Sequence, residues 1–165
     1  MLIMRLLYAL VEGVLFAGAG PGLLGDKLKG KTLFTTGLLL GLIAMGVRLV
    51  YDYFQITVIS HTYVLMVVIA VVFWQVSKLK FFKAVVATVL STTLLLVSEV
   101  LFLFPVMQYW GLTLELVLFE PLLFILAAIL SLLCLLIALM GVYLFDFALI
   151  RDQASKSHLE ENEKI

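Results

Sequence analysis

Four ionisable side chains interrupt the long apolar segments of this chain, and they are the residues best able to do chemistry: Glu12, Arg48, His61 and Glu99. Ionisable groups inside hydrocarbon are costly, so they usually pair with one another and face a bundle interior or a wet cavity. A carboxylate accepts hydrogen bonds, a guanidinium donates them, and an imidazole can do both. Such a set could bind a polar ligand, couple to an ion, or hold helices together.

Enzyme motifs are missing from this pattern. The sequence contains no H-E-x-x-H, no G-x-S-x-G and no phosphate-binding loop. The single cysteine, Cys134, lies in the last apolar segment without a second thiol or a nearby histidine, so we interpret it as an apolar helix residue. We therefore expect a non-enzymatic protein with no cofactor and no metal site.

The elements that position these residues follow from the composition. Hydrophobic residues make up 64% of the 165 residues and charged residues 13%, whereas soluble domains are about 45–50% apolar and about 25% charged. The apolar residues form segments of about 20, enough to cross a bilayer as helix. We predict an all-α polytopic membrane protein: one domain, 1–147, a bundle of five transmembrane helices with a short cytoplasmic tail at 148–165. The spans are expected at about 2–24, 32–50, 56–76, 84–104 and 122–147.

Proline, glycine and polar residues mark the expected ends of these spans. The glycine-rich stretch 18–22 should break the first helix, 51–55 should form a short turn, and Pro105 should stop the fourth span. Thr113 is expected to cap a short helix that Pro121 ends.

Residues 17–19 also resemble a signal-peptidase site, which leaves cleavage of the first span open. Glu12, in the middle of the apolar segment, argues against that cleavage.

Lysine and arginine counts predict the orientation, because cytoplasmic loops carry an excess of both. Nine of the eleven basic residues lie in the loops 27–31 and 78–83 and in the tail. Arg5 and Arg48 are the two exceptions. With five spans, this places the N-terminus outside and the C-terminus inside.

Depth along the predicted helices brings the ionisable residues toward one level. At the rise of an α-helix, Arg48 and Glu99 lie roughly 24 and 22 Å from the inner side. Glu12 lies roughly 15 Å and His61 roughly 7 Å from the outer side. Two interpretations stay open: a polar pocket that opens outward and binds a ligand, or structural contacts in which Arg48 pairs with Glu99 and His61 bonds across an interface.

Small residues line the helix faces that carry these groups. Such residues let membrane helices approach closely, and the expected packing positions are Gly13, Ala17, Gly37, Gly41 and Ala44. On the fourth span, Thr88, Thr92 and Leu95 share a face with Glu99. Serine and threonine hydroxyls of this span are expected to bond backbone carbonyls or neighbouring helices.

The order of these residues resembles a known family. Glu12-Gly13, Arg48, His61-Thr62 and the segment 96–99, with the loop 111–115, are similar to the membrane domains of Gram-positive-type sensor histidine kinases that carry a GHKL-type ATPase domain. The similarity covers roughly residues 5–147. In that family the last span continues into a dimerisation helix and the ATPase domain, for which 148–165 has no room. The resemblance therefore implies a sensor-like module without its kinase, or a fragment.

The function expected from the sequence is a non-enzymatic membrane sensor or regulatory module in two-component signal transduction. Its expected partners are the lipid bilayer, a cytoplasmic kinase or full-length sensor kinase, and a second copy in a homodimer, with no nucleic acid. Its expected location is the bacterial inner membrane. Two alternatives remain: a small transporter or transporter subunit that uses the intramembrane Glu, Arg and His, and a structural accessory protein.

Overall fold

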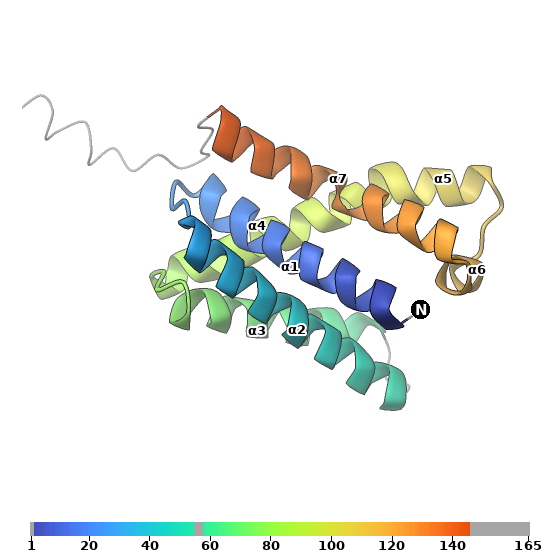
Figure 1. Ribbon diagram of the computed structural model, residues 1–165, viewed down its shortest axis with the longest axis horizontal. Helices are drawn as coiled ribbons and strands as arrows, with labels where there is room; N and C mark the ends of the chain where they lie inside the picture. Colours follow the sequence, from blue (N-terminus) through green and yellow to red (C-terminus); the bar gives the residue numbers. More distant parts are fainter. Residues whose placement is uncertain (1, 55–57, 146–165) are drawn as a thin grey trace, which may run out of the picture.

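Every regular element in the described part of the chain is a helix (Figure 1). The computed structural model describes residues 2–54 and 58–145; at 52, 58–62, 114, 115 and 118 it describes the backbone alone. The elements are α1 (Leu2–Leu23), α2 (Gly30–Phe54), α3 (Val58–Gln75), α4 (Phe81–Ser98), the π-helical turn η1 (Glu99–Leu103), α5 (Phe104–Tyr109), α6 (Leu114–Phe119) and α7 (Pro121–Leu144).

Four stretches of helix are long and apolar enough to cross a membrane: Leu2–Leu23, Gly30–Tyr51, Phe81–Tyr109 and Pro121–Leu144. The part of α3 from Tyr63 to Gln75 is apolar but shorter. Large apolar side chains cover the outside of the bundle, as they do where helices meet lipid tails. The predicted all-helical membrane fold is confirmed at this level. The predicted tail, 148–165, lies outside the described residues.

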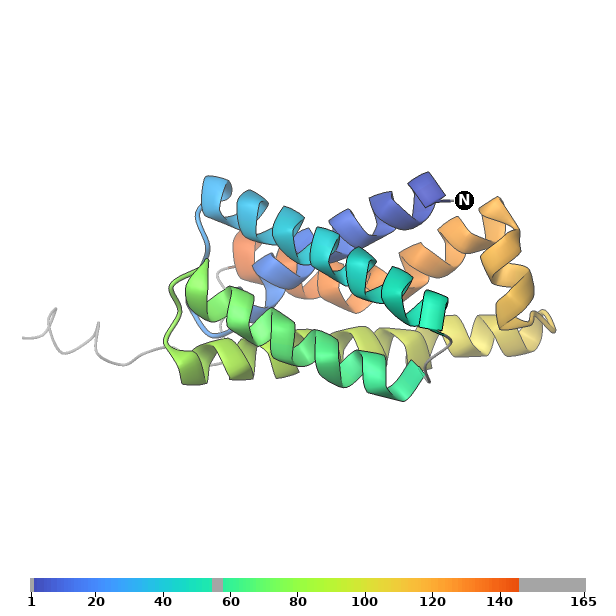
Figure 2. The same ribbon diagram turned by 90° about the horizontal axis from the view of Figure 1, so that it is seen from below.

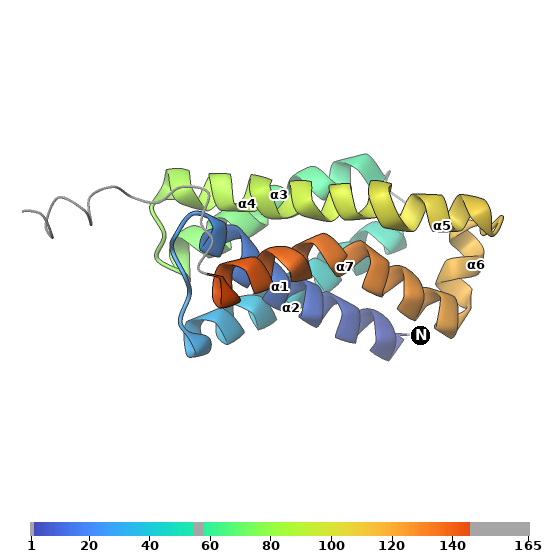
Figure 3. The ribbon, with the colours of Figure 1, turned by 90° about the horizontal axis from the view of Figure 1, so that it is seen from above.

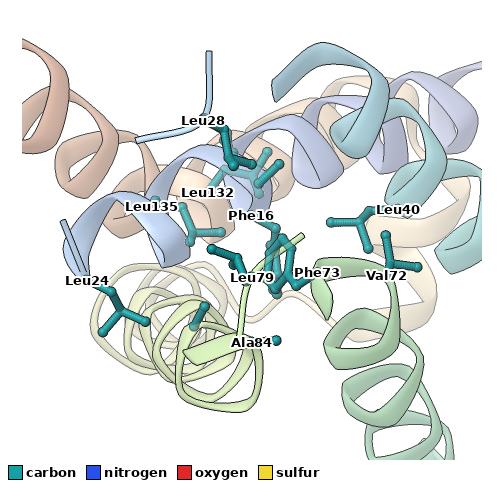
Figure 4. Close-up of a cluster of buried hydrophobic side chains, with 14 residues drawn as sticks. Phe16, Leu24, Leu28, Leu40, Val72, Phe73, Leu79, Ala84, Leu132 and Leu135 are labelled. Atoms are coloured by element: carbon teal, nitrogen blue, oxygen red, sulfur yellow. The ribbon is translucent and has the colours of Figure 1, made fainter. Parts of the chain in front are cut away.

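Helix α1 lies at the centre of the bundle. It packs most extensively against α2 and also contacts α7 and α4, while α3 packs against α2 and α4 (Figures 2 and 3). The apolar core includes Phe16, Phe73 and Leu135, together with Leu28 and Leu79 of the two loops that join α1 to α2 and α3 to α4 (Figure 4). The core therefore fills the half of the bundle next to those loops.

Glycines bring α1 and α2 into backbone contact. A methyl group added at Gly37 would lie 2.6 Å from Val14 Cα, and one at Gly41 would lie 2.5 Å from the Ala9 carbonyl oxygen. One added at Gly13 would lie 2.5 Å from the Gly41 nitrogen. Real side chains do not approach so closely, so this crossing requires glycine at all three positions.

Three predicted helix ends are wrong. Residues 18–22 do not break the first helix: α1 runs to Leu23 with Pro21 in its last turn, and its glycines pack against α4 and α7. Residues 51–54 continue α2 instead of forming a turn. Pro105 does not stop the fourth helix, because η1 carries the chain from α4 into α5 and reaches Tyr109. Contacts with α4 and α7 outweigh the local propensity of the glycines at 18–22, and the π-helical turn η1 accommodates Pro105.

The expected short helix is present. Thr113 caps α6, its hydroxyl accepting a hydrogen bond from the Leu116 nitrogen at 3.3 Å. Pro121 begins α7 at a position where the missing N–H costs nothing.

Polar contacts tie the lysine-rich loops together at one end of the bundle. Lys83 Nζ lies 2.9 Å from the Asp26 carboxylate, so the start of α4 is held to the α1–α2 loop. Tyr143 near the end of α7 donates a 2.9 Å hydrogen bond to the Leu28 carbonyl oxygen. Both loops and the end of α7 lie together at the left of Figure 1. The lysines of both loops are thus gathered at the same end.

Candidate functional site

An ion pair joins the charged residues of α1 and α2. The Nη2 nitrogen of Arg48 lies 2.8 Å from Glu12 Oε2 and donates a 2.9 Å hydrogen bond to Glu12 Oε1. The Glu12 side chain is 7% exposed and that of Arg48 29%. The glycine contact between α1 and α2 makes this pair possible, because it brings the two helices close enough for both side chains to meet between them.

Aromatic residues extend the ion pair toward α7. The Arg48 guanidinium carbon lies 5.5 Å from the centroid of the Tyr8 ring, within the range of a cation–π interaction. The Tyr8 ring in turn makes an edge contact with Phe124 of α7 at 6.0 Å. The charge on α2 is therefore linked through α1 to α7 by direct contacts.

Glu99 begins the π-helical turn. The amide of Phe104 bonds the Glu99 carbonyl oxygen, five residues earlier, instead of the carbonyl four residues earlier. Pro105 explains this widening, because its ring would clash with the carbonyl of Leu101 in a regular α-helix. Single π turns inside α-helices are frequent at functional sites. The Glu99 side chain is partly buried and forms no hydrogen bond or ion pair within the described residues.

Four hydroxyl side chains are buried on α4, and one of them is unsatisfied. Thr88 donates to the Ala84 carbonyl oxygen at 2.9 Å, Ser91 bonds the Phe16 carbonyl of α1, and Ser98 bonds the Leu130 carbonyl of α7. Thr92 is 8% exposed, and its hydroxyl has no hydrogen-bond partner among the described residues. Because buried polar groups normally have hydrogen-bond partners, the Thr92 hydroxyl can accept a hydrogen bond from a bound molecule or donate one to it.

These groups line a partly open cavity of about 200 Å³ between α1, α2, α3, α4 and the start of η1. Its polar lining consists of Glu12, Arg48, Thr92 and Glu99. Its apolar lining consists of Gly13, Phe16, Leu40, Ala44, Leu65, Met66, Ile69, Leu95 and Leu96. Ligand sites typically combine a mostly apolar wall with a few convergent polar groups, and this cavity has that composition.

Three of the four ionisable residues singled out in the sequence thus line one cavity, but the expected ion pair has a different partner. Arg48 pairs with Glu12 and not with Glu99. The reason is that depth along a span places residues at one level without saying which helices are neighbours. His61 lies in α3, at a position whose side chain is outside the described part of the chain.

Sequence reasoning missed the aromatic and α3 parts of this site. Tyr8 gave no signal among other apolar residues, although it lies four residues before Glu12 and so on the same face of a helix. The apolar wall from α3 depends on tertiary packing and has no sequence signature. The shared face of Thr92, Leu95 and Glu99, in contrast, could be predicted, and all three residues line the cavity.

The arrangement suits reversible binding better than covalent chemistry. It offers a compensated ion pair beside apolar walls, together with a carboxyl and a hydroxyl that have no hydrogen-bond partner among the described residues. Within the described residues there is no group of three or more His, Cys, Asp and Glu side chains able to hold a metal ion. Comparison of the chain with protein families, with curated proteins and with solved structures finds no match.

Proposed function

We propose that this protein is an integral membrane sensor module that binds a small ligand in the cavity between α1, α2, α3 and α4 and signals to a cytoplasmic partner. In this proposal α3 is a fifth span, the N-terminus is outside, and the lysine-rich loops are cytoplasmic. The positive-inside rule supports this orientation, because Lys27, Lys29 and Lys31 lie at the same end as Lys78, Lys80 and Lys83.

The observation that carries the proposal is the position of Glu99. It lines the cavity and is also the first residue of η1, which continues into α5 and packs against α7. A ligand that contacts Glu99 in one helix geometry more strongly than in another shifts the population toward that geometry. The change would then reach α7, whose last residues lie beside the cytoplasmic loops.

The output is proposed to be a contact made at the cytoplasmic end by residues 148–165 and the lysine-rich loops. The resemblance to the membrane domains of sensor histidine kinases supports a kinase or ATPase as the partner, in the membrane of a bacterium. Signalling by such a module needs no catalytic residue of its own, in keeping with the absence of enzyme motifs in the sequence.

Co-purification from native membranes without detergent tests this proposal. Three versions are compared: the unchanged chain, a deletion of 148–165, and Glu99→Gln. We expect a cytoplasmic kinase or ATPase to co-purify with the unchanged chain and to be lost on deletion. With Glu99→Gln it should still bind, but its autophosphorylation or ATPase rate should change. A rate that is the same with both full-length versions would contradict the role of the cavity.

A transporter is the second candidate, because ionisable side chains lining an intramembrane cavity also occur on substrate pathways. Uptake into liposomes that contain only this protein separates the two functions. Uptake that is abolished by Glu99→Gln would favour transport, whereas ligand binding without uptake would favour sensing.

A further inference from the structure

Apart from the Glu12–Arg48 ion pair, the polar groups that line the cavity are hydrogen-bond acceptors. Arg48 is already held by Glu12 and by the ring of Tyr8, so its charge is compensated within the protein. Glu99 adds a second carboxyl, which has no basic partner within hydrogen-bond distance among the described residues. When Glu99 is ionised, the described residues that line the cavity carry one net negative charge, which a cationic ligand would neutralise.

Thr92 strengthens this argument independently of charge. Thr92 lines the cavity, and its buried hydroxyl oxygen has no hydrogen-bond partner among the described residues, whereas the neighbouring Thr88, Ser91 and Ser98 are all bonded. On a membrane helix a threonine hydroxyl usually bonds the carbonyl one turn earlier, as Thr88 does. Thr92 is therefore available to accept a hydrogen bond from a molecule inside the cavity.

The remaining walls limit what can be attached to the cationic group. Leu65, Met66 and Ile69 of α3 line the cavity together with Leu95 and Leu96 of α4. A small, fully hydrated inorganic cation would leave these walls in contact with water. An organic molecule with a short apolar part would cover them and gain the free energy of their burial.

We propose that the ligand of this cavity is a small amphipathic primary amine. Its ammonium group donates hydrogen bonds to the Glu99 carboxylate and the Thr92 hydroxyl, and its apolar part lies against the side chains of α3. A primary ammonium has three N–H donors, so it can satisfy both acceptors together. The inference rests on the proposed ligand-sensing function and adds to it the chemical class of the ligand.

Calorimetric titration of the protein in lipid nanodiscs tests this class. The probes are hexylammonium, hexyltrimethylammonium, hexanol and hexanoate, which share the same apolar chain. Nanodiscs without protein correct for partitioning into lipid. We expect hexylammonium to bind at least about tenfold more tightly than hexanol or the trimethylated amine, because hydrogen bonds to charged groups contribute that much or more. Glu99→Gln and Thr92→Val should each weaken its binding, while Thr88→Val should not.

The outcomes separate the class of ligand from the existence of the site. Tighter binding of hexanol or hexanoate, still sensitive to Thr92→Val, would overturn the amine and leave the sensing site standing. Binding of no probe above the background of protein-free nanodiscs would overturn both. Equal binding of hexylammonium and hexyltrimethylammonium would show that no N–H donor is recognised and would also overturn the amine. Circular dichroism of each variant shows that it is folded, so that lost binding is not lost structure.

Discussion

Arg48 on α2 forms its ion pair with Glu12 on α1, at 2.8 Å, and Glu99 at the start of η1 has no ionic partner among the described residues, although both carboxyls line the same cavity. This asymmetry separates a structural role from a functional one. The Glu12–Arg48 pair holds the two most closely packed helices together, and Glu99 is left for a ligand.

Breaking the pair by one substitution should destabilise the protein strongly. Arg48→Gln leaves the buried Glu12 carboxylate uncompensated, and removing one partner of a buried pair costs about 3–5 kcal/mol. The double variant Glu12→Gln with Arg48→Gln should recover much of this loss. Thermal unfolding in nanodiscs measures the coupling. The losses of stability from Arg48→Gln and Glu99→Gln should be nearly additive. A larger coupling energy between Arg48 and Glu99 than between Arg48 and Glu12 would contradict the pairing of Arg48 with Glu12.

The glycine contact gives a matched comparison within the first two helices. Gly13→Ala places a methyl group against the backbone of α2, and overpacking of this kind costs about 1–3 kcal/mol. Gly46 of α2 has nothing within 4 Å of the position of an added methyl group. Gly46→Ala should therefore be neutral or stabilise by up to about 1 kcal/mol through helix propensity. Equal effects of the two substitutions on the unfolding temperature would refute this contact.

Two threonines one turn apart on α4 should respond oppositely to the same change. Thr92→Val removes a buried hydroxyl that has no partner, so stability should stay the same or rise by about 1 kcal/mol. Thr88→Val removes a bonded hydroxyl and should destabilise by about 1 kcal/mol or less. Thermal unfolding without ligand distinguishes them. A clear loss of stability from Thr92→Val would mean that its hydroxyl is satisfied within the protein.

The π turn should depend on Pro105. Pro105→Ala restores an N–H and removes the ring clash, so residues 99–104 can form a regular α-helix. Their amide hydrogen exchange should slow by about tenfold or more. Pro121→Ala is the control, because Pro121 begins α7 where no intrahelical bond is lost. Exchange at 99–104 that Pro105→Ala leaves unchanged would mean that another contact maintains the turn.

Thiol labelling of cysteine variants that also carry Cys134→Ala determines the orientation of the protein in the membrane. Tyr109 is 87% exposed and is the last residue of α5, which lies at the opposite end of the bundle from the α1–α2 loop that contains Lys29 (Figure 1). A membrane-impermeant reagent added to right-side-out vesicles should label Tyr109→Cys. Lys29→Cys should be labelled only after the vesicles are opened. The reverse pattern would invert the topology and place the lysine-rich loops outside.

The sequence was informative about features that depend on one helix alone. The length of the apolar segments predicted the helices, and the position of Glu12, Arg48 and Glu99 along their helices placed them at a similar depth. Helix ends were less predictable at residues 18–22, where contacts with α4 and α7 keep the glycines helical, and at Pro105, which a π-helical turn accommodates. The choice of Glu12 over Glu99 as partner of Arg48 depends on which helices are neighbours, and no pattern within one span contains that information.

In the proposed function, a ligand bound in the cavity moves α7 relative to α4. Spin labels at Phe82 and Leu144, 77% and 67% exposed, would report the separation of the two helices at the loop end of the bundle. The measurement is their distance distribution in nanodiscs, with Cys134→Ala, before and after hexylammonium is added at a concentration that calorimetry shows to be saturating. We expect the distribution of distances between the two labels to shift in the otherwise unchanged chain and to stay the same in Glu99→Gln. An unshifted distribution in a protein whose cavity is shown to be occupied would contradict it.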